Sequence, residues 1–98
     1  MEWVEDGFVH GFKIWIGDLP ASFPNHALRD CLLEVCRVDD INCIRSPKCS
    51  TGQWCAILTI RCPHDAQKLY QHLGEVKVHH DDGKPRFIVY KWYNGRRS

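Results

Sequence analysis

The segment Ile14-Trp15-Ile16-Gly17-Asp18-Leu19-Pro20 decides the fold prediction. Two isoleucines flank Trp15, and because side chains alternate across a strand, this spacing predicts one apolar face and places Trp15 on the other. The Gly-Asp pair favours a turn, and Pro20 cannot donate to a strand ladder, so the strand should end there. The sequence therefore predicts a first strand over residues 13–16.

The residues that follow predict a helix and a hairpin. From Leu28 the apolar positions are spaced i, i+3, i+4, i+7 and i+8, which predicts an amphipathic helix beginning near Pro24 or Asn25. Residues 41–45 and 53–60 read as two strands joined by a polar loop that contains Pro and Gly. The third strand has a period of two, with its core face formed by Ala56, Leu58 and Ile60 and its other face by Gln53, Cys55, Ile57 and Thr59.

The last third of the chain predicts a second helix and a final strand. Pro63 suits the first turn of a helix whose apolar residues repeat at helical spacing up to Leu73. The segment Asp81-Asp82-Gly83 is typical of a tight turn, and residues 86–92 are rich in β-branched and aromatic side chains. The predicted order of elements is therefore βαββαβ.

Composition limits the function classes. The chain has 98 residues, 44% of them apolar and 26% charged, which is typical of one globular domain. A net charge of +1 excludes strong attraction of the whole molecule to a polyanion. There is no apolar run of about 20 residues, and the first residues are acidic where a secretory signal begins with basic ones. We therefore expect an intracellular protein, nuclear or cytoplasmic, with no membrane contact.

The sequence predicts no metal, no cofactor and no catalysis. The six cysteines contain no C-x-x-C pair, and we expect reduced thiols, with Cys31 and Cys36 in the core. The histidines beside Asp81-Asp82 are adjacent, so they would face opposite sides of a strand, and a hairpin explains them better than a metal site. Cys55 as a nucleophile would need a base that no motif supplies.

From residue 12 to residue 92 the chain resembles the RNA-recognition motif (RRM) family. The segment 14–20 is similar to the family's first-strand signature, with Asp18 in place of the usual Asn, and residues 53–60 align with the third-strand octapeptide. The segment Pro63-His64-Asp65-Ala66 stands where the family has Pro-Glu-Asp-Ala. The resemblance implies an α+β fold, a ferredoxin-like sandwich whose four-stranded antiparallel sheet has two helices packed on one face. It also implies a leader over residues 1–11, an RRM-like domain over 12–93 and a basic tail over 94–98.

The chain departs from the family pattern where the family binds RNA. Cys55 and Ile57 occupy positions where RNA-binding members carry aromatic rings, and Gln53 and Trp54 replace a basic residue followed by Gly. Of the three signature rings, only the one at Trp15 has a match. The fold prediction is unaffected, because the core alternation is intact.

The resemblance implies that single-stranded RNA binds the open sheet face, as part of post-transcriptional RNA processing or regulation. Trp15 would stack a base. If Phe87 and Val89 point to the helices, Arg86, Ile88, Tyr90 and Trp92 share the open face with it. Phosphates would be held by Arg86 or Lys91 together with two cations of the loop between strands two and three. The predicted RNA-binding residues are Lys13, Trp15, Arg45, Lys48, Gln53, Cys55, Ile57, Arg86, Tyr90 and Trp92.

The alternative is a protein-interaction module that uses the same face. The missing octapeptide aromatics and the near-zero charge favour it, since Cys55, Ile57 and Ile88 would make that face apolar. Trp3 and Phe8 of the leader either cover the open face, which would block RNA, or pack at its edge. The sequence leaves both choices open, and we expect a monomer.

Overall fold

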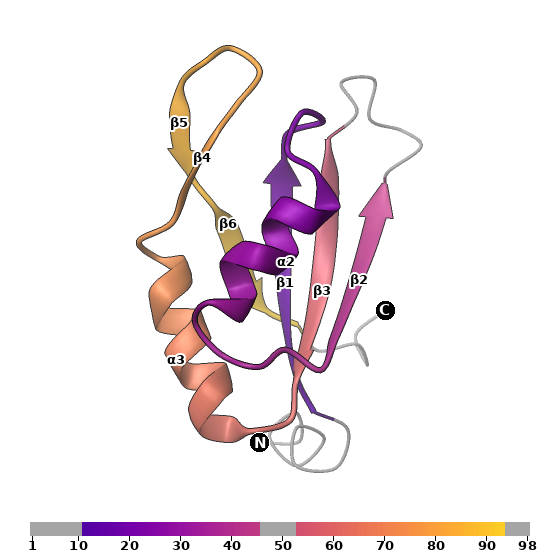
Figure 1. The fold of residues 1–98 in the computed structure, drawn as a ribbon, viewed down its shortest axis with the longest axis vertical. Helices are drawn as coiled ribbons and strands as arrows, with labels where there is room; N and C mark the ends of the chain where they lie inside the picture. Colours follow the sequence, from indigo (N-terminus) through magenta and orange to yellow (C-terminus); the bar gives the residue numbers. More distant parts are fainter. Residues whose placement is uncertain (1–10, 46–52, 94–98) are drawn as a thin grey trace.

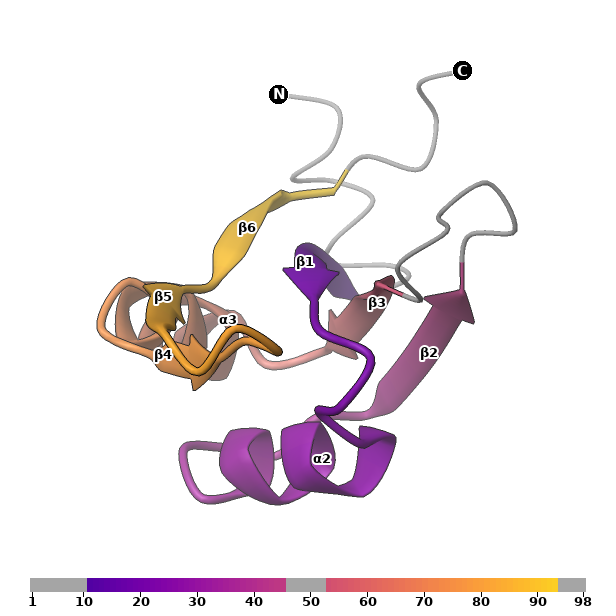
Figure 2. The same ribbon diagram turned by 90° about the horizontal axis from the view of Figure 1, so that it is seen from above.

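The computed structural model describes residues 11–45 and 53–93. Along the chain lie β1 (Phe12–Leu19), α2 (Asn25–Leu33), β2 (Asp40–Arg45), β3 (Trp54–Ile60), α3 (Pro63–Leu73), β4 (Lys77–His79), β5 (Pro85–Phe87) and β6 (Val89–Trp92). Four strands form an antiparallel sheet in the order β2-β3-β1-β6, and β4 and β5 form a separate two-stranded sheet. Figure 1 shows α2 in front of the larger sheet and α3 beside its strands, and Figure 2 shows α2 below the sheet. The predicted α+β, ferredoxin-like class is confirmed.

The core lies between the larger sheet and the two helices. Ile14 and Ile16 of β1 are buried, and so are the alternate residues of β3 that the sequence assigned to the core. Each helix contributes one apolar stripe to the core. Leu28 and Leu32 belong to the stripe of α2, and Leu69 belongs to that of α3. Within the described ranges, neither helix has the length and apolarity that a membrane crossing needs.

The predicted last strand is wrong in one respect, because it is two strands separated by Ile88. That residue is buried at 8% exposure, and its N–H donates to the Val76 carbonyl at 3.1 Å. Its neighbours Phe87 and Val89 are 59% and 48% exposed, so neither points to the helices. Because Ile88 turns into the core, the strand pairing is interrupted at this residue. Before it, β5 pairs with β4, and after it, β6 pairs with β1.

The predicted turn over residues 81–83 is confirmed and closes the β4–β5 hairpin. The N–H of Gly83 donates to the His80 carbonyl at 2.8 Å, and the N–H of His80 donates to the Lys84 carbonyl at 3.1 Å. Gly83 has φ +80°, a conformation that glycine adopts without a steric penalty. The two histidines before the turn therefore belong to a hairpin, as expected.

Asp18 adopts the left-handed conformation, with φ 58°, where the β1–β3 register shifts between Ile16 and Leu19. Asp and Asn tolerate this conformation better than β-branched residues do. We expect Asp18→Val to lower the free energy of unfolding by about 1–2 kcal/mol and Asp18→Asn to change it by less than about 0.5 kcal/mol. Chemical denaturation measures both. In the matched control, Asp40→Val in β2, the extended backbone should accept valine; an equal loss in both Val variants would contradict the explanation.

Candidate nucleic-acid interface

The face of the larger sheet away from the helices is defined by its pairing register, since residues directly opposite each other share a face. Trp15 of β1 pairs with Ile57 of β3 on one side and with Lys91 of β6 on the other. We call this surface the open face. Its residues are Lys13, Trp15, Gly17, Asp40, Asn42, Ile44, Cys55, Ile57, Thr59, Val89 and Lys91.

Trp15 lies half-buried at the centre of the open face, on top of Gly17. A Cβ atom at Gly17 would lie 2.0 Å from Cη2 of the indole, so only glycine leaves room for the ring in this position. The Nζ of Lys91 lies 5.1 Å from the ring centroid, within the range of a cation–π contact. The ring is therefore held by the backbone beneath it and by an ammonium group over its face, which a stacking base would have to displace.

The rest of the open face mixes apolar and polar side chains. Ile44 is 39% exposed, and Cys55 and Ile57 are half-buried. The Nζ of Lys13 donates to Oγ1 of Thr59 at 3.4 Å, which places a second ammonium group on the open face. Such a surface offers one aromatic platform, an apolar surround and two positive charges.

Tyr90 and Trp92 lie on the helix side of the sheet, so their predicted place on the open face is wrong. Tyr70 of α3 stacks on Trp92 with ring centroids 4.3 Å apart, and meets Tyr90 edge-on at 4.9 Å. The cause is the register of β6, in which Tyr90 pairs with the buried Ile16. Ile88 is also turned into the core, and Lys91 takes the position beside Trp15.

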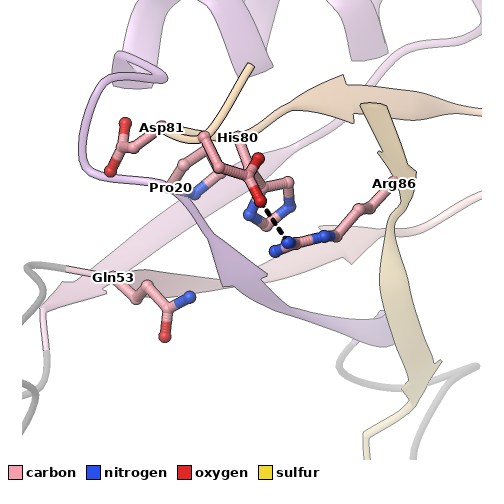
Figure 3. A pocket seen from close by; sticks show the side chains of 6 residues that line it. Pro20, Gln53, His80, Asp81 and Arg86 are labelled. Atoms are coloured by element: carbon pink, nitrogen blue, oxygen red, sulfur yellow. Dashed lines mark hydrogen bonds and ion pairs between the residues drawn. The ribbon is translucent and has the colours of Figure 1, made fainter. Parts of the chain in front are cut away.

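Arg86 lies in the β4–β5 hairpin and not on the four-stranded sheet, which corrects its predicted place. Its Nη2 forms an ion pair with Oδ2 of Asp82. The side chain reaches into a hollow of about 190 Å³ (Figure 3). Gln53 lines this hollow at its other side, and the full lining is Pro20, Gln53, His80, Asp81, Asp82 and Arg86.

Of the two loop cations predicted to hold phosphates, Arg45 and Lys48, only the first lies within the described residues. Arg45 is the last residue of β2. Lys48 lies outside the described residues, as do Trp3 and Phe8 of the leader. The two alternatives for Trp3 and Phe8, over the open face or at its edge, therefore both stay predictions.

Trp54 has a structural role that the sequence did not predict. It is 2% exposed, and its Nε1–H donates to the carbonyls of Pro20 and Phe23 at 3.0 and 3.1 Å. The Phe23 ring stacks on it with centroids 6.5 Å apart. The indole thereby fixes the turn after β1. The signal was present, since Trp54 continues the core alternation of β3.

The predicted place of Cys31 and Cys36 in the core is wrong, because both thiols are only partly buried: Cys36 packs against the core cluster from outside it, and Cys31 does not belong to the cluster. Burial raises the pKa of both, and the nearby Glu34 carboxylate adds to the rise at Cys31. A raised pKa leaves less thiolate at neutral pH and makes these thiols poor nucleophiles. In residues 11–45 and 53–93, no three metal-binding side chains come together.

Comparison with known proteins gives a match in structure and none in sequence. No protein-family model matches the chain, and no curated protein matches it. A solved structure titled "Structure of RNA15 RRM" superposes with a TM-score of 0.68, covering 88% of this chain and 93% of that one at 13% identity. The chain has an RRM-like fold.

A second structure of that RRM, titled as having bound RNA (GU), superposes on the chain with a TM-score of 0.64 at 15% identity. The match covers 85% of this chain and 83% of that one. At these identities the likeness establishes the RRM-like fold.

The contact between Trp15 and Gly17 makes a prediction. Gly17→Ala should displace the indole and lower the free energy of unfolding by about 1–3 kcal/mol, because the added methyl group overpacks the site. Chemical denaturation of the two single variants and of Trp15→Ala/Gly17→Ala completes a double-mutant cycle. The cost of the alanine at 17 should largely vanish once the ring is absent. An unchanged cost would show that the ring does not lie on Gly17.

Proposed function

We propose that this RRM-like domain binds single-stranded RNA on the open face, with Trp15 stacking on one base. The single observation that carries the proposal is the placement of Trp15, half-buried on Gly17 with the Lys91 ammonium over its ring and with neither described helix on that face. A strand-held indole provides the flat π-surface that base stacking requires. The RNA-bound structure among the structural neighbours supports the same use of the fold.

The charges beside Trp15 define how the RNA backbone would be held. Lys13 and Lys91 supply two ammonium groups on the open face, and Asp40 at the start of β2 supplies a carboxylate. Two phosphate contacts give modest affinity, so we infer that the domain works beside other RNA-binding units in RNA processing or regulation. We also propose an intracellular binding protein without catalytic activity or cofactor.

Salt dependence tests this proposal directly. For two neutralised phosphates on single-stranded RNA, the logarithm of the association constant should fall against the logarithm of salt concentration with a slope of about −1.4. Fluorescence anisotropy with a labelled pool of short random RNAs measures the slope. Lys91→Gln should bring it to about −0.7, whereas the control Lys77→Gln on the separate hairpin should leave it unchanged. No binding at low salt would contradict the proposal.

A protein partner on the same face is the second candidate, and the exposed apolar side chains favour it. Ile44 and Val89 expose a large part of their surface on either side of Trp15. An apolar partner would bind almost independently of salt. If RNA fails to bind, while a partner binds with a flat salt response and loses affinity on Ile44→Ser or Val89→Ser, this candidate replaces RNA.

A further inference from the structure

The hollow beside the open face has its own chemistry, which stacking on Trp15 does not use. It lies between the residue that follows β1, the residue that precedes β3, and the β4–β5 hairpin (Figure 3). Arg86 reaches into it from β5, and Asp81 lines it from the turn. The hollow therefore joins a fork of hydrogen-bond donors and a carboxylate acceptor at one end of the sheet.

The hairpin holds the Arg86 guanidinium in place. Oδ1 of Asp82 accepts the Lys84 N–H at 2.9 Å, and Oδ2 of the same carboxylate pairs with Nη2 of Arg86. Among the described residues, the Asp82 carboxylate is the one partner of the guanidinium, which carries five N–H donors. The remaining donors are left for a ligand, in the planar arrangement that binds two adjacent acceptors.

Charge and size limit what the hollow binds. Asp81 and Asp82 place two carboxylates against the single guanidinium of Arg86, so a phosphate would meet net like charge there. A volume of about 190 Å³ lies below the roughly 300 Å³ at which sites for drug-sized molecules begin. A small, uncharged, planar ligand with both donors and acceptors fits these limits.

Guanine is the RNA base whose edges match this pair of side chains. Its O6 and N7 are adjacent acceptors suited to a bidentate guanidinium, and its N1–H and N2–H groups are adjacent donors suited to a carboxylate. Adenine, cytosine and uracil do not offer two neighbouring donor groups. We propose that the hollow binds a guanine base of the same RNA strand that crosses the open face, with Arg86 and Asp81 as its recognition residues.

The place of the hollow fits a continuous strand. Pro20, which lines it, directly follows β1 and lies five residues after Trp15, so at about 3.3 Å per residue the two are at most about 17 Å apart. A few nucleotides span that distance, so one strand stacked on Trp15 can reach the hollow. This inference rests on the proposed function, and its test has to separate the two.

The test compares two neutral nucleosides that differ by one group. Guanosine and inosine are titrated separately into the isotope-labelled protein, and NMR follows the Arg86 side chain and the Asp81 backbone amide. Inosine lacks the N2 amino group that would donate to Asp81, so guanosine should bind about tenfold more tightly. Asp81→Asn should abolish that difference, and the control Asp30→Asn, on α2 and outside both the hollow and the open face, should keep it. Equal affinities in the unchanged protein would overturn the proposal.

Further arms identify the source of the base and the role of the platform. Ribose 5-phosphate should leave the hollow unshifted, and a shift there would replace the guanine site with a phosphate site. A short RNA with one guanine should bind more tightly than guanosine 5′-monophosphate, and the reverse order would assign the hollow to free nucleotides.

A guanine-free RNA hexamer tests the platform alone through the Trp15 indole signal. If Trp15 responds and guanosine leaves the hollow unshifted, only this inference fails; if guanosine shifts the hollow and Trp15 stays silent, only the platform fails.

Discussion

Trp15→Ala should weaken RNA binding by about 5- to 150-fold, the loss expected when one stacked base loses its platform. The same change should lower the free energy of unfolding by less than about 2 kcal/mol, because the ring is half-buried on the open face and outside the core. Fluorescence anisotropy and thermal unfolding measure the two effects on the same samples.

Trp15→Phe is the conservative control, since it keeps a ring on Gly17 and should recover most of the affinity. A loss of stability well above 2 kcal/mol in Trp15→Ala would mean that the ring is packed under other parts of the chain, and the open-platform mechanism would fail. A small loss of stability with unchanged RNA affinity would place the ring outside the binding site.

Trp54→Ala should have the largest effect on stability, a loss of about 3–5 kcal/mol, because it empties a buried site and removes a hydrogen-bond donor. That loss is a large share of the stability expected of a domain of this size. Chemical denaturation measures it, and Trp15→Ala serves as the matched change of the same residue type on the other face.

Trp54→Phe keeps the fold testable if the alanine variant does not fold. It retains the ring stacked near Phe23 and leaves the Pro20 and Phe23 carbonyls without their indole donor, at a cost of about 1–3 kcal/mol. Equal stabilities for Trp54→Phe and the unchanged protein would show that the hydrogen bonds to these carbonyls do not stabilise the turn after β1.

The sequence predicted the parts of the fold in which local alternation and burial agree. Ile14 and Ile16 lie two apart, and so do the core residues of β3, so the period of two identified both central strands. The helical spacing before Leu73 identified α3 in the same way. These patterns are local, because each element buries one face against the same core.

The last strand could not be predicted in this way, because a tertiary contact breaks its pattern. Ile88 is buried and bonds to Val76, so the alternation restarts after it and Tyr90 and Trp92 turn toward Tyr70. An aromatic at such a position is compatible with either face until the register is known. The hollow was also beyond sequence reasoning, since Gln53 and Arg86 come to line the same hollow only through the packing of the hairpin.

The most direct test of the central claim is an NMR titration of the protein with a pool of short random RNAs, followed through its tryptophan indole signals. RNA binding on the open face should give a large, saturable shift of the Trp15 Nε1–H and of the amides of β1 and β3 on that face. The Trp54 Nε1–H, bonded to the Pro20 and Phe23 carbonyls on the other side of the sheet, should stay in place. No shift at Trp15, or equal shifts at Trp15 and Trp54, would contradict RNA binding on the open face.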